Sequence, residues 1–233
     1  MSISSSKKGS KRAKAAAAFY DMDGTLVKTN LVHALLFQAK NQSGVLRSIT
    51  RTAQITASIP MFFLIDFYNR SVFQETFFRS YKGESEDRLH FLSEDLFEQV
   101  IKPSIFPGAK DLIERSRSIG LRQVLVTGAL DITVAPLARY LQIDDWITNR
   151  LEFVDGFATG RLLPPVMVNA TKASWIRTYA EKEGLSLHDS YCYTDSISDL
   201  PMLSVVGHPA AVNPDFRLRS AANQNNWPIL DLK

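Results

Sequence analysis

Acidic side chains follow two apolar segments of this chain, and they are the residues whose types and spacing best suit chemistry. Asp21 and Asp23 come directly after the apolar run over residues 16–20, and Asp195 follows a later run with Asp199 four residues on. In an open α/β sheet, ligands bind beyond the carboxyl ends of the strands, so we expect these carboxylates to meet in one crevice. Carboxylates held together need a cation, and a site made of oxygen ligands suits Mg²⁺.

A hydroxyl group and an ammonium group complete the pattern. Thr127 and Gly128 end a β-branched apolar run, and Lys172 opens a predicted helix. A metal ion and Lys172 together would form a positive pocket for a dianion, while Thr127 and nearby backbone N–H groups would donate hydrogen bonds. This set of carboxylates, hydroxyl and ammonium groups indicates phosphoryl transfer, in which positioning and charge neutralisation provide most of the rate acceleration. The Asp-x-Asp pair can then divide the roles of nucleophile and acid–base group.

Each of these residues also has an ordinary structural explanation when it is considered alone. Asp-Gly pairs are common in turns, so Asp21 and Asp23 could form one. Lys172 could be a solvated helix residue, and Asp199 could cap a helix. Their joint order and their position at strand ends favour the catalytic interpretation. The four histidines show no paired metal-ligand spacing.

Strands and helices alternate after residue 103, which predicts a parallel, doubly wound sheet of the α/β class. Glycines 120 and 184 mark the ends of two helices. We expect helices at 109–119, 131–141, 171–182 and 200–205, strands at 121–126, 189–194 and 210–212, and a β-hairpin at 152–163.

Residues 30–102 have a helical pattern instead, with apolar side chains three or four positions apart and only Gly44 and Gly83 as breakers. We therefore predict a helical cap at 30–102 inserted after the first strand, a catalytic core at 15–29 and 103–233, and a basic flexible tail at 1–14.

Composition excludes several classes of protein. The chain has 233 residues, of which 45% are hydrophobic and 22% charged, as expected of an ordinary globular fold. Its net charge of +3 arises from five basic side chains in the first fourteen residues, because the remainder holds 22 basic and 24 acidic groups. A nucleic-acid-binding fold is therefore not expected.

The sequence also bears on compartment. The single cysteine, Cys192, cannot form an internal disulfide and reads as a buried strand residue, so we expect a reducing, cytoplasmic location. The basic leader is followed by an apolar stretch too short for a signal peptide, and no apolar run is long enough to span a membrane.

The motifs resemble those of the haloacid dehalogenase superfamily. The segment 19–27 (Phe-Tyr-Asp-Met-Asp-Gly-Thr-Leu-Val) is similar to its first motif, Val126-Thr127-Gly128 to its second, Lys172 to its third and 193–202 to its fourth. The resemblance implies a Rossmann-like core in which Asp21 is the nucleophile and Asp23 the general acid and base. It also implies that Mg²⁺ is held by Asp21, the Asp23 backbone carbonyl and Asp195 with support from Asp199, and that phosphate is held by Thr127, Gly128 and Lys172.

The helical insert resembles the C1-type cap of subfamily IB, the phosphoserine-phosphatase-like branch. In the phosphoserine phosphatases that this branch resembles, a glutamate at the position of residue 30 holds the substrate ammonium. This chain has Asn30 there instead. Phe78 falls where those enzymes have a basic cap residue for the substrate carboxylate. Both differences disfavour phosphoserine, since an amino-acid zwitterion would leave its charges unpaired.

The first half of the cap suggests a different substrate. Residues 24–65 include four basic side chains and no acid, and 59–65 is an apolar, aromatic-rich run. This pattern fits either the core of a helical bundle or a seat for a lipid phosphate and peripheral contact with an anionic membrane.

The sequence therefore predicts a Mg²⁺-dependent phosphatase that acts on a small or lipid-like phosphate monoester through an aspartyl-phosphate. Three alternatives remain: a true phosphoserine phosphatase, a phosphomutase that shields the aspartyl-phosphate from water, and a receiver-type signalling domain that accepts a phosphoryl group.

Overall fold

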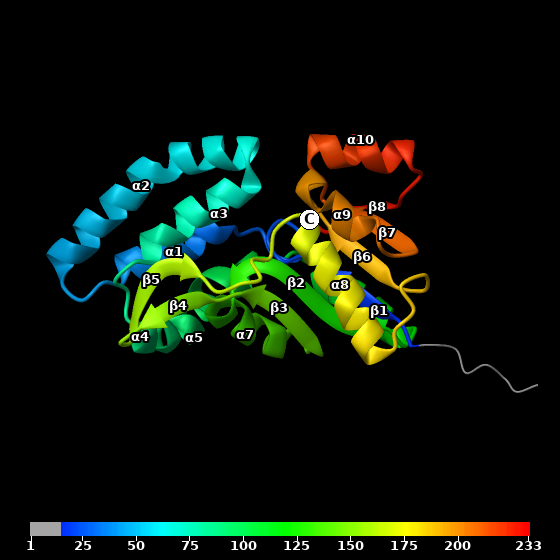
Figure 1. Cartoon of the computed structure of the whole chain (residues 1–233), viewed down its shortest axis with the longest axis horizontal. Helices are drawn as coiled ribbons and strands as arrows, with labels where there is room; N and C mark the ends of the chain where they lie inside the picture. The colour runs from blue at the N-terminus through cyan, green and yellow to red at the C-terminus, as the bar shows by residue number, and fades with distance from the viewer. Residues whose placement is uncertain (1–14) are drawn as a thin grey trace, which may run out of the picture.

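The computed structural model describes residues 15–233 and contains one six-stranded parallel sheet, in the order β3-β2-β1-β6-β7-β8 (Figure 1). The predicted doubly wound α/β fold is confirmed. Its strands are β1 (Ala17–Tyr20), β2 (Arg122–Leu130), β3 (Asp145–Asn149), β6 (Tyr191–Thr194), β7 (His208–Val212) and β8 (Ile229–Leu230).

Helices cover both faces of the sheet because the central strand is apolar on both sides. Ala18 and Tyr20 of β1 pack into one core cluster, and Ala17 and Phe19 pack into the other. Cys192 of β6 is fully buried in the second cluster, as predicted. The first face is covered by α6 (Ala109–Ser118) and α7 (Asp131–Tyr140), and the second by α8 (Ala170–Glu183), α9 (Leu200–Leu203) and α10 (Phe216–Gln224).

The strand order reverses at β1, which pairs with β2 on one side and with β6 on the other. Such a switch point opens a crevice at the carboxyl ends of the strands. The residues that follow β1 and β6 therefore meet there, together with those near the end of β2.

The chain from the start of α1 to the end of η3, residues 31–104, contains helices only, and we call this segment the cap. Phe62, Phe73 and Phe77 form its aromatic centre, with ring centroids 5.3 to 6.3 Å apart. Its helices are α1 (Leu31–Lys40), α2 (Val45–Tyr68), α3 (Arg70–Phe78), η1 (Arg79–Tyr81), α4 (Glu86–Phe91), α5 (Ser93–Leu96), the π-helix η2 (Phe97–Ile101) and η3 (Lys102–Ser104).

The predicted hairpin is present as β4 (Leu151–Val154) and β5 (Phe157–Leu162), which pair antiparallel. It lies against the cap, because the Gly83 amide donates to the Ala158 carbonyl at 2.8 Å and the Ala158 amide donates to Glu84 at 2.8 Å. Gly160 lies inside β5, and a Cβ there would be 3.1 Å from the Arg79 Cα.

Several predicted boundaries were wrong. Strand β2 continues past Gly128 to Leu130, and its pairing with β3 shifts register between Val126 and Leu130. β3, α10, β8 and the short helix η4 (Ile197–Asp199) were not predicted; β3 is a partly exposed edge strand without clear alternation. The basic tail at 1–14 lies outside the described residues. Within residues 15–233, no helix is both long and apolar enough to cross a membrane.

Candidate active site

Asp21 begins the loop that follows β1, and its position is fixed by the sheet. Its amide donates to the Tyr193 carbonyl at 2.9 Å, which extends the pairing of β1 with β6 by one hydrogen bond. The loop then closes on itself, since the amides of Leu26 and Val27 both donate to the Met22 carbonyl. A rigid turn therefore holds the two aspartates of the Asp-x-Asp pair.

Lys172 lies at the start of α8 and is buried, with 6% of its surface exposed. Its Nζ atom donates to Asp21 Oδ1 at 2.7 Å and to Asp199 Oδ2 at 2.8 Å. Asp199 Oδ2 also accepts from Thr194 Oγ1 at 3.0 Å. Lys172 is therefore not a solvated helix residue, and the Asp199 side chain makes no capping hydrogen bond to α9.

Asp195 follows β6 and packs directly on the turn after β1. Thr25 Oγ1 donates to Asp195 Oδ1 at 3.0 Å. Gly24 has a φ of +80°, and a Cβ at this position would lie 2.2 Å from Asp195 Oδ2. The glycine of the Asp-Met-Asp-Gly motif is thus required both by its backbone conformation and by the close approach of this carboxylate.

Thr127 and Gly128 lie in β2 where its pairing with β3 shifts register. Thr127 is 2% exposed, and its Oγ1 accepts a hydrogen bond from the Ala129 amide at 3.1 Å. Gly128 is held by a side chain of β3, since its carbonyl accepts a hydrogen bond from Asn149 Nδ2 at 2.8 Å. The backbone of this segment therefore has a defined orientation toward the cavity.

The sequence reasoning missed Asn149 and Gln74, which link this segment to its surroundings. Asn149 is fully buried; its Nδ2 also donates to Gln74 Oε1 at 3.0 Å, and its Oδ1 accepts from the Met167 amide at 2.7 Å. Gln74 belongs to the cap helix α3. Asn149 is a polar residue at the carboxyl end of a strand, so recognising β3 would have identified it.

Asp21, Asp23 and Asp195 have raised pKa values, first because they are buried away from water and then because carboxylates lie close together. Burial, and then the negative charge of Asp21, raises the pKa of Asp23 to about 7 and that of Asp195 to about 8. Burial also raises the pKa of Asp21, although Lys172 opposes it. Burial would lower the pKa of Lys172, but Asp199 and Asp21 raise it above its ordinary value. Lys172 is therefore a permanent cation in the cavity.

One open cavity of about 340 Å³ brings together eight of the nine predicted site residues. The cap also contributes Arg70 and Asp66, which the sequence reasoning did not identify. Arg70 Nη1 is 2.7 Å from both carboxylate oxygens of Asp66, and its charge lowers the pKa values of Asp21 and Asp23. The eight are Asp21, Asp23, Asn30, Thr127, Gly128, Lys172, Asp195 and Asp199.

The cap therefore supplies a basic side chain to the cavity, contrary to the expectation based on Phe78. Arg70 lies eight residues before that position and on the same helix, α3. An ungapped comparison cannot register such a displacement along the helix, because it pairs residues by position in the sequence and not by the cavity that they line.

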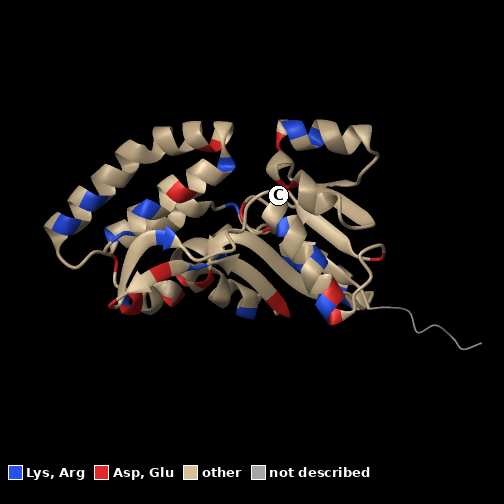
Figure 2. Cartoon of the chain, viewed as in Figure 1, with Lys and Arg blue, Asp and Glu red and all other residues tan. Residues whose placement is uncertain are grey.

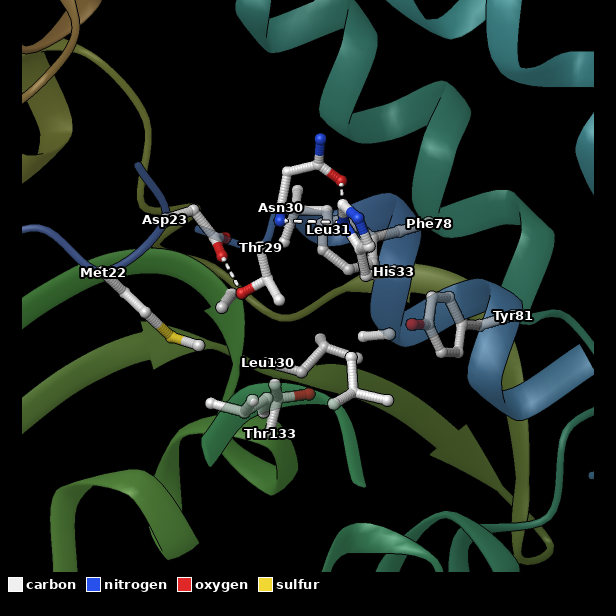
Figure 3. Close-up of a pocket in the computed structure, with 14 residues that line it drawn as sticks. Met22, Asp23, Thr29, Asn30, Leu31, His33, Phe78, Tyr81, Leu130 and Thr133 are labelled. Carbon is white, nitrogen blue, oxygen red and sulfur yellow. Dashed lines mark hydrogen bonds between the residues drawn. The ribbon is translucent and has the colours of Figure 1, made fainter. Parts of the chain in front are cut away.

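Phe78 itself lies outside the catalytic cavity. It lines a small adjoining pocket with Asn30, Asp23 and Tyr81, which Figure 3 shows between the turn after β1 and the cap. Phe78 is 1% exposed, and its ring centroid is 5.9 Å from that of Tyr81. In the same view Thr29 Oγ1 donates to Asp23 Oδ1 at 3.4 Å, and the Asn30 side chain lies beside His33. Asn30 caps helix α1 by accepting from the Val32 amide.

The residues present fit a hard divalent cation. Asp21, Asp195 and the Asp23 backbone carbonyl would supply oxygen donors only. Burial, and then the charge of neighbouring carboxylates, raises the pKa values of Asp21 and Asp195, and a bound cation would favour their ionised forms. Among residues 15–233, no three His, Cys, Asp or Glu side chains gather as a metal cluster. The predicted set contains only two side-chain ligands and a carbonyl, so such a cluster is not needed.

The sequence matches the family model of haloacid dehalogenase-like hydrolases over residues 18–204. The chain belongs to this family. The match includes all nine predicted site residues and the entire cap, so the resemblance inferred from the four motifs is confirmed.

Individual proteins agree with the family assignment. The chain is 31% identical to the phosphoserine phosphatase SerB1 of Mycobacterium tuberculosis over 219 residues, which cover 94% of this chain and 71% of the relative. A protein of unknown function from Bordetella pertussis Tohama I has a TM-score of 0.81 at 26% identity, covering 95% of this chain and all of that one. A phosphoserine phosphatase structure titled as a phospho-aspartyl intermediate analogue has a TM-score of 0.71 at 19% identity, with 94% of each chain covered; this likeness concerns the fold.

The chain is therefore an enzyme, a phosphatase of the haloacid dehalogenase-like family, as the sequence predicted. This result excludes the receiver-type signalling domain among the alternatives.

Proposed function

We propose that the protein hydrolyses phosphate monoesters with the help of Mg²⁺ and through an aspartyl-phosphate on Asp21. Residues 15–29 and 103–233 would form the catalytic core, and residues 30–102 the cap over it. The observation that carries the proposal is the buried ion pair of Lys172 with Asp21 and Asp199, beside an Asp23 whose pKa is about 7.

In the first step, a carboxylate oxygen of Asp21 bonds to phosphorus while the bond from phosphorus to the alcohol oxygen breaks. Asp23 donates its proton to that departing oxygen. A pKa of about 7 suits this role, because the carboxyl group is still protonated in a large fraction of molecules near neutral pH. The Lys172 ammonium, 2.7 Å from Asp21 Oδ1, favours the ionised form of Asp21 that the attack on phosphorus requires.

In the second step, the Asp23 carboxylate takes a proton from water as the water oxygen bonds to phosphorus. The bond between Asp21 and phosphorus breaks, which releases inorganic phosphate and restores both carboxyl groups. If the aspartyl-phosphate were shielded from water, the same residues would serve a phosphomutase. Release of free phosphate distinguishes the two outcomes.

The chain would hold the phosphoryl group with three donors. The Thr127 hydroxyl, the Gly128 amide and the Lys172 ammonium all line the cavity that contains Asp21. Asp21, the Asp23 carbonyl and Asp195 would hold Mg²⁺, and Asp199 would support them by positioning Lys172. When bound, Mg²⁺ supplies positive charge that neutralises the phosphate oxygens.

We propose a small or lipid-like phosphate as the substrate. Beside the catalytic residues, the cavity continues into a pocket lined by Leu31, Val32, Phe62, Phe63 and Phe73, with Asp66 and Arg70 at its side. An apolar leaving group would fit this lining. A lipid-like substrate also implies peripheral contact with a membrane.

Hydrolysis of phosphoserine is a second candidate, because one observation favours it. Asp66 and Arg70 lie side by side in the cavity, and together they offer an anion and a cation to a zwitterion. Asn30, by contrast, offers no charge. The name of the relative SerB1 is consistent with this candidate.

The mechanism is tested by hydrolysis of p-nitrophenyl phosphate with Mg²⁺ or with EDTA. We expect turnover only with Mg²⁺, no detectable turnover by Asp21→Asn, and a loss of about 100-fold or more for Asp23→Asn. Asp155→Asn, on the exposed hairpin turn, is the matched control and should retain full activity. Metal-independent turnover, or full activity of either site variant, would contradict the mechanism.

The substrate is tested by comparing kcat/KM for phosphoserine, sugar phosphates and lysophosphatidate, with release of inorganic phosphate as the readout. We expect lysophosphatidate to lead. A lead for phosphoserine by orders of magnitude would favour the second candidate.

A further inference from the structure

Helix α2 presents apolar side chains to the outside of the molecule, where helices of globular proteins normally present polar ones. Of its 24 residues, only Ile55 and Phe62 are buried. Eight of the seventeen large hydrophobic side chains that are exposed in residues 15–233 belong to this helix. Seven exposed residues three or four positions apart form what we call the α2 stripe: Leu46, Ile49, Ala53, Ala57, Met61, Leu64 and Tyr68.

The α2 stripe is separate from the core of the cap. The opposite side of α2 already packs inward, since the Phe62 ring lies 5.3 Å from that of Phe77. Figure 1 shows α2 along the outer edge of the cap. The apolar run at 59–65 is therefore divided between the two sides of the helix: Phe62 belongs to the bundle core, while Leu64 is 58% exposed.

The α2 stripe leads to the mouth of the active site. Phe67 and Tyr68, at the end of α2, line an open groove with Phe216 and Arg217 of α10 and with Arg70. Arg217 lies over the Phe67 ring, 4.8 Å from its centroid, and Phe216 is 86% exposed. The ends of α2 and α10 lie at the same upper edge of the molecule in Figure 1. The exposed apolar surface thus continues to a groove that shares Asp66, Arg70 and Ser198 with the catalytic cavity.

The charges around this surface are mainly positive. The charged residues of α2 are Arg47, Arg51 and Asp66, and none belongs to the stripe. Asp66 is paired with Arg70 and Arg51 with Glu84, so within residues 15–233 Arg47 is the charged residue of α2 outside these ion pairs. Figure 2 shows basic residues near the start of α2 and at the start of α10, which hold Arg47 and Arg217 respectively.

We propose that the α2 stripe, with Phe216 and the flanking arginines, binds the surface of an anionic lipid bilayer. An amphipathic helix with a long apolar face and flanking cations is the element that inserts at a membrane interface. A second copy of the chain fits less well. Two stripes packed antiparallel would bring Arg47 of one copy toward Arg217 of the other, which places like charges together. The inference rests on the proposed function and deepens it, because it names the surface through which the phosphatase would contact the membrane that holds a lipid-like substrate.

The test is sedimentation of the full chain with vesicles of phosphatidylcholine alone or with about one third phosphatidylglycerol. We expect binding to the anionic vesicles only, weakening as salt is raised. The double variant Ile49→Glu/Leu64→Glu should bind about tenfold more weakly or worse, because it places two carboxylates on the stripe. Ile119→Glu/Val154→Glu, which changes two exposed apolar residues elsewhere, is the matched control and should bind as the wild type does.

Two further measurements keep the outcomes distinct. Turnover of p-nitrophenyl phosphate without lipid should be equal in all these proteins, since neither Ile49 nor Leu64 lines the catalytic cavity; this verifies folding and is independent of lipid binding. Undiminished vesicle binding by the stripe variant, or no binding by the wild type, would overturn the proposal. A wild-type dimer in analytical ultracentrifugation that becomes monomeric in the stripe variant, without vesicle binding, would assign the stripe to a second copy instead.

Discussion

Replacing Asp195 by Asn should stabilise the metal-free protein, and increasingly so as the pH rises. Asp195 lies against Gly24 beside Asp21, and burial and that neighbouring charge raise its pKa to about 8. An unfolded chain would release the same proton near pH 3.8, the ordinary value. The native state therefore retains a proton that the unfolded state has lost across this window, so rising pH favours unfolding. An amide at position 195 has no such proton.

The magnitude follows from the difference in bound protons. One proton bound only by the native state changes the free energy of unfolding by about 1.4 kcal/mol per pH unit. Between pH 5 and pH 7, both inside the window from 3.8 to about 8, the wild type should lose about 3 kcal/mol through this group. The advantage of Asp195→Asn over the wild type should grow by the same amount.

Urea unfolding in EDTA at pH 5, 6 and 7 measures this difference directly. Asp155→Asn is the matched control, because Asp155 is exposed on the hairpin turn and does not line the catalytic cavity. Mg²⁺ should stabilise the wild type and have little effect on Asp195→Asn. An advantage that stays constant within about 0.5 kcal/mol from pH 5 to pH 7 would refute the assignment of Asp195 to a crowded carboxylate cluster.

Three other substitutions test the surroundings of the site. Asn149→Ala removes the hydrogen bond to the Gly128 carbonyl, so we expect it to lower the free energy of unfolding by about 2–4 kcal/mol and to raise KM. Urea unfolding and steady-state kinetics measure these two effects, and an unchanged KM would contradict a positioning role. Gly24→Ala places a Cβ 2.2 Å from Asp195 Oδ2, so a higher Mg²⁺ concentration should be needed for half-maximal turnover; an unchanged requirement would contradict this. Arg70→Gln should raise KM for anionic substrates by about tenfold, whereas Arg70→Lys should raise it less, and equal effects would assign Arg70 to packing.

Much of the fold was predictable because its strands and helices depend on residues that are close together in the sequence. The short apolar strand before Asp21 and the helix that ends at Gly184 follow from composition and spacing, and both are present. Strand β3 was missed because an edge strand is only partly buried and lacks clear alternation. Asn149, at its end, was missed with it, although it anchors the Gly128 segment.

The sequence alone determined the family, the order of the site motifs and the identity of the two aspartates after β1, because these depend on residues a few positions apart. Tertiary structure decided how distant residues meet. Lys172 lies 151 positions from Asp21, and only the parallel sheet brings their charges within 2.7 Å. The cap is the clearest case: α2 carries large apolar residues on its exposed side as well as on its buried side, so its periodicity cannot indicate which side is buried. Packing against Phe73 and Phe77 selects Phe62 for the core and leaves Leu64 on the surface.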